Sequence, residues 1–423
     1  MEKKQLTEFI KQGQLDEKIA YLMGKEKVES QKERYLRIIE KADVLYKANE
    51  YHIFSAPGRS EIGGNHTDHQ NGHVLAASVN VDIICVACEN DDYVEVYSEG
   101  FDIKPIAIND LNPRKEEEHT TEALIRGTLY RFKELGYNIG GFKGYFDSEV
   151  LKGSGISSSA AYEVLIGTVL SHLYNDGKIS PIEIAKIGQF AENVHFNKPC
   201  GLMDQMACSV GGFVAIDFKD VNNPIVINVN RNFSDYNHHL VLVDTKGDHA
   251  DLSDEYGYMR SEMNDVAKFF NKEVLSELTL DEVLKNVKAI REATSDRALL
   301  RAIHFFNEDK RAVAEKEALE NNDFELFKQI VLDSGDSSYK FLQNVYSTKN
   351  ISEQNISVGL ALSEQILKDK GAYRVHGGGL AGTIQAIVPD ELLVDYLTLL
   401  DSCFGEGSAM VMNIRPEGGV KLV

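Results

Sequence analysis

Polar side chains that could bind a ligand gather in the stretch SAPGRSEIGGNHTDHQNGH, which runs from Ser55 to His73. It holds three histidines, one arginine, one aspartate and four glycines. His66, Asp68, His69 and His73 could surround a metal ion, or the loop could hydrogen-bond a molecule that carries many hydroxyl groups. Metal ligands must converge on one point. His66 and His69 would do so on a helix, but the glycines and asparagines here disfavour a helix. The residues therefore favour a hydroxyl-rich ligand over zinc.

A second segment, GSGISSSA, runs from Gly153 to Ala160 between a strand pattern and a helical pattern. The backbone N–H groups that open a helix are unpaired and carry partial positive charge, and glycine lets the main chain approach an anion closely. The consecutive serines add hydroxyl groups for phosphate oxygens or a metal ion. The segment predicts a phosphate-binding loop, with a serine-capped tight turn as the alternative. It is not a Walker A loop, because GxxxxGK[ST] occurs nowhere in the chain.

A third glycine-rich segment, GGGLAG from Gly377 to Gly382, matches the pattern GxGxxG. A dinucleotide-binding loop with this pattern must open a helix inside a βαβ unit. Here the residues TIQAIVP follow, and they have a strand pattern. We therefore expect a glycine turn between two strands and not a dinucleotide site.

Strands and helices must position these three segments. The hydrophobic pattern predicts helices in residues 1–50 and over most of 255–332, and strands in 72–90 and 142–150. A further helix is predicted to begin after Ser180, which has the side chain of an N-cap residue and is followed by proline. Strands and helices without regular βα alternation indicate the α+β class. At 423 residues, the chain is too long for one core.

The composition excludes several classes of function. The net charge is −21 and no dense run of Lys and Arg occurs, which argues against nucleic acid and anionic membranes as partners. No apolar run approaches the ~18 residues of a membrane span, and the first residues lack the apolar core of a signal peptide. Five cysteines are sparse, as in a reducing cytosol. Cys85 and Cys88 form a C-x-x-C, but in a strand this spacing places them on opposite faces. We expect a cytoplasmic protein without an obligate protein partner.

The ordered segments PGRSEIGGNHTDH, GSGISSSA and HGGGLAG resemble the galactokinase branch of the GHMP kinases, which include galactokinase, homoserine, mevalonate and phosphomevalonate kinases. The resemblance runs from about residue 30 to the C-terminus and includes AENVHFNKPCGLMDQMACSVGG and DEYGYMR. It implies an α+β fold of two domains with the active site in the cleft between them. Residues 1–218 would form a domain like domain 2 of ribosomal protein S5, with the sugar-binding motif and the phosphate loop. Residues 219–423 would form a ferredoxin-like domain.

The resemblance also implies an activity and the residues that carry it. The activity is ATP-dependent phosphorylation of the anomeric hydroxyl of galactose to galactose 1-phosphate, with ATP and Mg²⁺. Asp204 matches the catalytic base, and Arg59 matches the residue beside the reacting hydroxyl. The sugar ligands would be Asn65, His66, Asp68 and Tyr256. The nucleotide would lie on Gly153, Ser154, Gly155, Ile156, Ser157, Ser158 and Ser159. The metal would be held by Ser159 and Glu192.

Taken singly, the two central residues have ordinary structural interpretations. Asp204 could be a helix N-cap, and Arg59 could be a surface charge. Together they could do chemistry, because an arginine beside the aspartate would keep it ionised and ready to accept a proton.

The first segment departs from the usual galactokinase motif, GRVNLIGEHTDY. Glu61 stands where asparagine is usual, and Asn65 stands where a glutamate usually contacts the hydroxymethyl group of the sugar. We expect Asn65 to make the site more tolerant at the sixth carbon, with galactose as the substrate and galacturonate or galactosamine as alternatives. A non-catalytic sugar sensor is a further alternative. The intact SSSAA, Arg59 and Asp204 argue against it.

Overall fold

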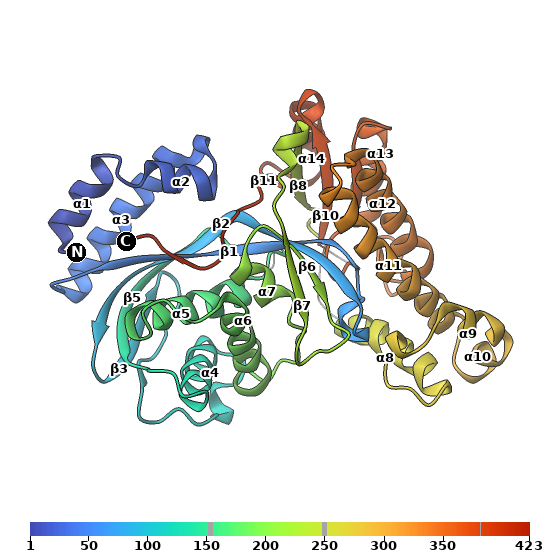
Figure 1. Ribbon diagram of the computed structural model, residues 1–423. Coiled ribbons are helices and arrows are strands. Elements are labelled where there is room, and N and C mark those ends of the chain that lie inside the picture. The colour runs from blue at the N-terminus through green and yellow to red at the C-terminus, as the bar shows by residue number, and fades with distance from the viewer. Residues whose placement is uncertain (151–154, 248–251, 381) are drawn as a thin grey trace. The chain divides into compact units, whose positions relative to one another are not determined.

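The computed structural model describes residues 1–150, 155–247, 252–380 and 382–423 (Figure 1). The chain folds into two compact units. Unit 1 comprises Met1–Arg59, Ser78–Gly212 and Ile414–Val423, and unit 2 comprises Ser60–Ala77 and Phe213–Asn413. Both units contain parts of two long strands, β1 (His52–Gly63) and β2 (His73–Asn90). The domain boundary at residue 218 stays a prediction.

Unit 1 contains a mixed sheet in the order β12-β1-β2-β5-β3-β4. The remaining strands of this sheet are β3 (Tyr93–Ser98), β4 (Ile106–Ala107), β5 (Gly141–Ser148) and β12 (Val420–Lys421). Strand β5 pairs antiparallel with β2 and parallel with β3. Nearly every residue of β2 is buried, which explains why this strand has a continuous apolar sequence and not an alternating one.

The sheet of unit 1 is accompanied by helices. They are α1 (Lys3–Lys11), α2 (Asp16–Met23), α3 (Val28–Tyr46), α4 (Thr121–Glu134), α5 (Ser158–Tyr174), α6 (Pro181–Phe190) and α7 (Met203–Val210). Ile84, Val86 and Cys88 of β2 share one core with the apolar residues of α1–α3. Cys85 is also buried and points to the opposite face of the strand. The prediction that these two cysteines occupy opposite faces is therefore confirmed.

Unit 2 contains a four-stranded antiparallel sheet in the order β11-β8-β10-β9. Its strands are β8 (His238–Asp244), β9 (Ala372–Val375), β10 (Thr383–Pro389) and β11 (Ala409–Met412). Helices α13 (Asn355–Leu367) and α14 (Leu393–Phe404) share a core with this sheet. In the same unit, the first residues of β2 pair with β6 (Phe213–Asp217), and β6 pairs with β7 (Ile225–Val229).

Helices α8 (Ser253–Phe269), α9 (Leu280–Lys285), α10 (Val287–Ala293) and α11 (Asp296–Glu320) of unit 2 share a second core. Helix α12 (Phe324–Ser337) packs against α11 and β9. The prediction of a helical region over most of 255–332 is confirmed, as is the α+β class. The N-cap prediction is also confirmed, because the Ser180 hydroxyl accepts a hydrogen bond from the Glu183 N–H at 3.2 Å. The third glycine segment connects β9 to β10, as its strand-like neighbours predicted.

Candidate active site

Asp204 lies in the first turn of α7 in unit 1, where it forms an ion pair with Arg59. Arg59 Nε donates to one carboxylate oxygen at 2.7 Å, and the Ser157 hydroxyl donates to the other at 2.5 Å. Burial opposes the charge, but Arg59 and the Ser157 hydrogen bond lower the pKa of Asp204 below its ordinary value. The side chain of Asp204 keeps 34% of its surface exposed. The structure therefore provides an ionised and accessible proton acceptor.

The described part of the predicted phosphate loop, from Gly155 to Ser159, lies beside this ion pair. A second guanidinium nitrogen of Arg59 donates to the Gly155 carbonyl at 2.5 Å, and the Arg59 N–H donates to the Ile156 carbonyl at 3.1 Å. Gly58 allows this approach, since a Cβ at that position would lie 2.8 Å from the Ile156 oxygen. The first helical residue is Ser158, so the N–H groups that open α5 follow directly. Gly153 and Ser154, also predicted to bind the nucleotide, lie outside the described residues.

Ser159 and Glu192, the predicted metal ligands, lie against each other in unit 1. The Ser159 hydroxyl donates to Glu192 Oε1 at 3.2 Å. Glu192 is 2% exposed, and the Lys198 ammonium lies 2.8 Å from the same oxygen, Oε1. A hydroxyl and a carboxylate are hard oxygen ligands of the kind that Mg²⁺ prefers. The ammonium shows that this carboxylate already binds a positive charge, so the pair fits a divalent cation.

The Glu192 carboxylate is held from its other side by Gln205. The Gln205 amide nitrogen donates to Glu192 Oε2 at 2.8 Å and to Glu163 Oε2 at 3.0 Å. Glu192 itself lies in a single π-helical turn, Ala191–His195, which continues α6. Such turns frequently mark functional positions, because they change the direction of one side chain within a helix.

A cavity of about 380 Å³ lies beside the start of α5 in unit 1. Ser158 and Ser159 form part of its wall, and most of the rest is apolar, with contributions from Ile83, Phe101 and Leu124. An apolar cavity with a few polar groups at one end is typical of a binding site for a flat organic group.

In unit 2, His66 and His69 form a pair of neutral imidazoles. His66 Nδ1 lies 3.3 Å from His69 Nε2, and His66 Nε2 lies 3.4 Å from the Gly378 carbonyl. Burial lowers the pKa of both histidines below the ordinary value. A carbonyl only accepts hydrogen bonds, so His66 carries its proton on Nε2. Asp68 begins a short 3₁₀ turn two residues after His66 and is partly exposed.

Tyr256, on α8, contacts the third glycine segment. Its hydroxyl donates to the Gly379 carbonyl at 2.8 Å. Burial raises the pKa of Tyr256 to about 12, so the hydroxyl keeps its proton at neutral pH. Gly378 must be glycine at this contact, because a Cβ there would lie 2.7 Å from the tyrosine ring.

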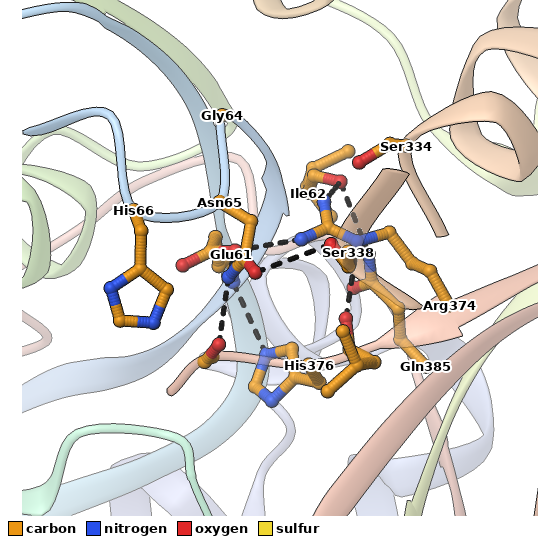
Figure 2. Close-up of polar contacts among 12 residues, drawn as sticks. Glu61, Ile62, Gly64, Asn65, His66, Ser334, Ser338, Arg374, His376 and Gln385 are labelled. Atoms are coloured by element: carbon orange, nitrogen blue, oxygen red, sulfur yellow. Dashed lines mark hydrogen bonds and ion pairs between the residues drawn. The ribbon is translucent and has the colours of Figure 1, made fainter. Parts of the chain in front are cut away.

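Asn65 differs from the other predicted sugar ligands because its side chain is fully enclosed (Figure 2). Its amide nitrogen donates to Glu61 Oε1 at 2.8 Å and to the Gly377 carbonyl at 2.7 Å. Its amide oxygen accepts from the Asn344 amide at 2.9 Å and from the Ser338 hydroxyl at 3.4 Å. An asparagine amide has two donors and two acceptor positions, so all four are used within unit 2.

The four residues that could have formed a metal cage do not converge. His73 Nδ1 lies 2.9 Å from Asp309, and its Nε2 lies 3.5 Å from Asp217, whereas His66 and His69 face each other. In the described parts of the chain, no group of three or more His, Cys, Asp and Glu side chains could hold a metal ion. No helix in those parts is long and apolar enough to cross a membrane.

Comparisons with known proteins bear on the same segments. Residues 123–212 match the family described as the GHMP kinases N terminal domain, and residues 44–89 match the galactokinase galactose-binding signature. A galactokinase of Clostridium acetobutylicum is 29% identical over 379 residues, which cover 87% of this chain and 92% of that protein. A galactokinase of Actinobacillus pleuropneumoniae is 29% identical over 342 residues, 79% and 85% of the two chains.

The chain is similar to the galactokinase branch of the GHMP kinase family. Solved structures show the same fold. The Lactococcus lactis galactokinase complexed with galactose aligns with a TM-score of 0.76 at 22% identity, over 92% of this chain and 99% of that one. The mevalonate kinase of Methanococcus jannaschii aligns with a TM-score of 0.59 at 16% identity, over 87% and 99% of the two chains. The GHMP kinase fold predicted from the motifs is therefore confirmed.

Three features of this site were not predicted from the sequence. The π turn at Glu192, the bridging amide of Gln205 and the apolar cavity beside α5 depend on residues that lack a distinctive local pattern. Gln205 directly follows Asp204, the expected base. This position was the one sequence signal that could have pointed to a role for Gln205 in the site.

Proposed function

We propose that this protein is a galactokinase that transfers the terminal phosphoryl group of ATP to the anomeric hydroxyl of galactose. The observation that carries the proposal is the ionised Asp204, which is fixed by Arg59 and Ser157 at the phosphate loop of unit 1. The galactokinase relatives and the galactose-binding signature over residues 44–89 support galactose as the sugar.

In this mechanism Asp204 accepts the proton that leaves the anomeric hydroxyl. Arg59 keeps Asp204 ionised, and its charge also lowers the pKa of a hydroxyl bound next to it. Phosphoryl transfer depends mainly on positioning and on neutralising the charge of the transferred group. The N–H groups that open α5 are suited to hold phosphate oxygens, and the apolar cavity beside them is suited to take the base of the nucleotide.

Mg²⁺ would bind to Ser159 and Glu192, with the nucleotide phosphates as further ligands. It would neutralise charge on the transferred group. Gln205 would hold the Glu192 carboxylate in place, and the Lys198 ammonium would leave Oε1 when the metal binds.

The sugar would be held by His66, Asp68 and Tyr256. His66 offers a neutral imidazole in a fixed tautomer, and Asp68 offers a carboxylate that can accept from two hydroxyl groups. We further propose that the protein works in the cytoplasm, where ATP is made and where its five free cysteines would stay reduced.

A panel of sugars tests the proposal. Purified protein with ATP and Mg²⁺ should release ADP most efficiently with galactose, when compared with galactosamine, galacturonate and glucose. ADP release with galacturonate or galactosamine alone would show that another sugar, and not galactose, is the substrate. Binding of galactose without any ADP release would indicate a sugar sensor and not an enzyme.

A further inference from the structure

The backbone of the glycine segment in unit 2 is held by side chains at three successive residues. The Gly377 carbonyl accepts from Asn65, and the Gly379 carbonyl accepts from Tyr256. Between them, the Gly378 carbonyl accepts from His66 and from the Asn344 amide at 3.3 Å. Since glycine restricts its own backbone least, these contacts determine the conformation of the segment.

Asn65 makes the shortest of these contacts and connects the segment to a buried charge pair. The carboxylate that accepts from Asn65 belongs to Glu61, which is 5% exposed. The same oxygen, Glu61 Oε1, lies 2.9 Å from the guanidinium of Arg374, which is 0% exposed. A second nitrogen of Arg374 donates to the Ile62 carbonyl at 2.7 Å. Figure 2 shows this chain of contacts from Arg374 through Glu61 to Asn65.

The main chain on either side of the Asn65 side chain is also fixed. The N–H groups of Gly64 and Asn65 both donate to Glu308 Oε1, at 3.3 and 3.2 Å. The Asn65 carbonyl lies 3.0 Å from His304 Nε2. The residue therefore cannot turn its amide toward a ligand without breaking buried hydrogen bonds and leaving their partners unpaired, which is unfavourable.

We propose that Asn65 is a positioning residue, which holds the glycine segment Gly377–Gly379 through the Gly377 carbonyl and does not contact the sugar. The proposal rests on the proposed galactokinase function. It replaces the expectation that Asn65 tunes the site at the sixth carbon of the sugar. Glu61 accepts the second amide hydrogen of Asn65, and the Arg374 charge stabilises that carboxylate. The amide is essential because only a donor can hold a carbonyl, and a carboxylate at residue 65 would repel both the Gly377 oxygen and Glu61.

Two matched variants separate this role from a purely structural one. Asn65→Asp keeps the shape of the side chain but removes both donors and places a second carboxylate beside Glu61. In the double variant Glu61→Gln/Asn65→Asp, the carboxylate and the amide exchange places. Their mutual hydrogen bond and the net charge of the pair are restored, but nothing can donate to the Gly377 carbonyl. The exposed Asn321→Asp in the same unit is the control for the change of residue type.

Three measurements are made on each variant: thermal stability, backbone hydrogen exchange of peptides spanning the glycine segment, and kcat and KM with galactose and 6-deoxygalactose. For Asn65→Asp we expect a lower Tm, faster exchange in the glycine segment and a kcat that is lower by roughly 10–100-fold. The ratio of kcat/KM between the two sugars should stay as in the wild type. The double variant should recover part of the lost Tm, since the hydrogen bond within the pair returns, but not the slow exchange or kcat.

Any of three results would overturn the proposal. A changed preference between galactose and 6-deoxygalactose would show that Asn65 contacts the sixth carbon. Unchanged exchange in Asn65→Asp, or full recovery of kcat in the double variant, would show that the Gly377 contact does not matter. The exchange measurement needs no activity. A wild-type protein that releases no ADP would therefore defeat the proposed function and still leave the positioning role open to test.

Discussion

Asp204 and Asn65 are both polar residues in recognised motifs, but the structure surrounds them in opposite ways. Each carboxylate oxygen of Asp204 accepts one hydrogen bond, and a third of the side chain is exposed. A carboxylate oxygen can accept more than one, so Asp204 keeps capacity for a ligand. Asn65 is 0% exposed and has used all four of its hydrogen-bonding positions. Unused hydrogen-bonding capacity, and not residue type, distinguishes a residue that can react from one that supports the site.

The largest effect on kcat should come from removing the charge of the Asp204 carboxylate. Asp204→Asn is nearly isosteric: its amide oxygen can accept from Arg59, and its amide nitrogen can donate to the Ser157 hydroxyl. If Asp204 takes the proton, kcat should fall by roughly 10²–10⁴-fold while Tm changes little. The exposed Asp176→Asn serves as the control. A variant that keeps more than a third of the wild-type kcat would remove Asp204 from the role of base.

A smaller effect is expected at the predicted metal ligand. Glu192→Gln keeps the shape of the side chain but removes the charge that a hard cation requires. The Mg²⁺ concentration for half-maximal activity should rise by about tenfold or more, while KM for galactose stays nearly constant. Titrations of Mg²⁺ and galactose on this variant and on the exposed Glu134→Gln check this. A change in sugar KM alone would place Glu192 at the sugar.

Substitution of Glu308 tests whether its buried charge stabilises the fold around Asn65. Burial opposes its ionisation, but His304, Arg311 and Arg374 lower the pKa of Glu308 to about 2. A depressed folded pKa adds stability above the ordinary carboxyl pKa, and this stability is lost as the pH falls toward the folded value. Glu308→Gln should therefore lower the free energy of unfolding by about 1–3 kcal/mol at pH 7. Denaturant unfolding should show that the difference in this free energy between wild type and variant becomes smaller between about pH 5 and pH 2. If the difference in unfolding free energy between wild type and variant did not depend on pH, the lowered pKa of Glu308 would be contradicted.

The smallest effect concerns His73, which contacts two carboxylates at the edge of the same unit. Its hydrogen bond to Asp309 and the nearby Asp217 raise the pKa of His73, against the effect of partial burial. A raised folded pKa adds stability that is complete below the ordinary histidine pKa and is lost as the pH rises through the folded value. Thermal melts of His73→Gln should fall below the wild type at pH 6 and converge with it at alkaline pH. Convergence at low pH instead would mean that His73 is buried in its neutral form.

Site residues that belong to recurring motifs could be predicted from the sequence. Contacts that depend on how distant parts of the chain pack could not. The family resemblance placed Arg59 near Asp204, where it could keep the aspartate ionised, and the structure contains this ion pair. For Asn65, comparison with the usual motif showed a lost carboxylate. It could not show that Glu61 accepts from the amide that replaces it, or that Arg374, more than 300 residues further on, balances the charge. Long-range partners of this kind are fixed by how β1 and β9 pack, and a local pattern contains no record of that packing.

The most direct test of the account is the position of the phosphate on the product. Wild-type protein is incubated with galactose, ATP and Mg²⁺, and the product is examined by phosphorus-31 NMR. A galactokinase should place one phosphate on the anomeric oxygen for each ADP released. A phosphate on any other carbon, or ADP release without a phosphorylated sugar, would contradict the account.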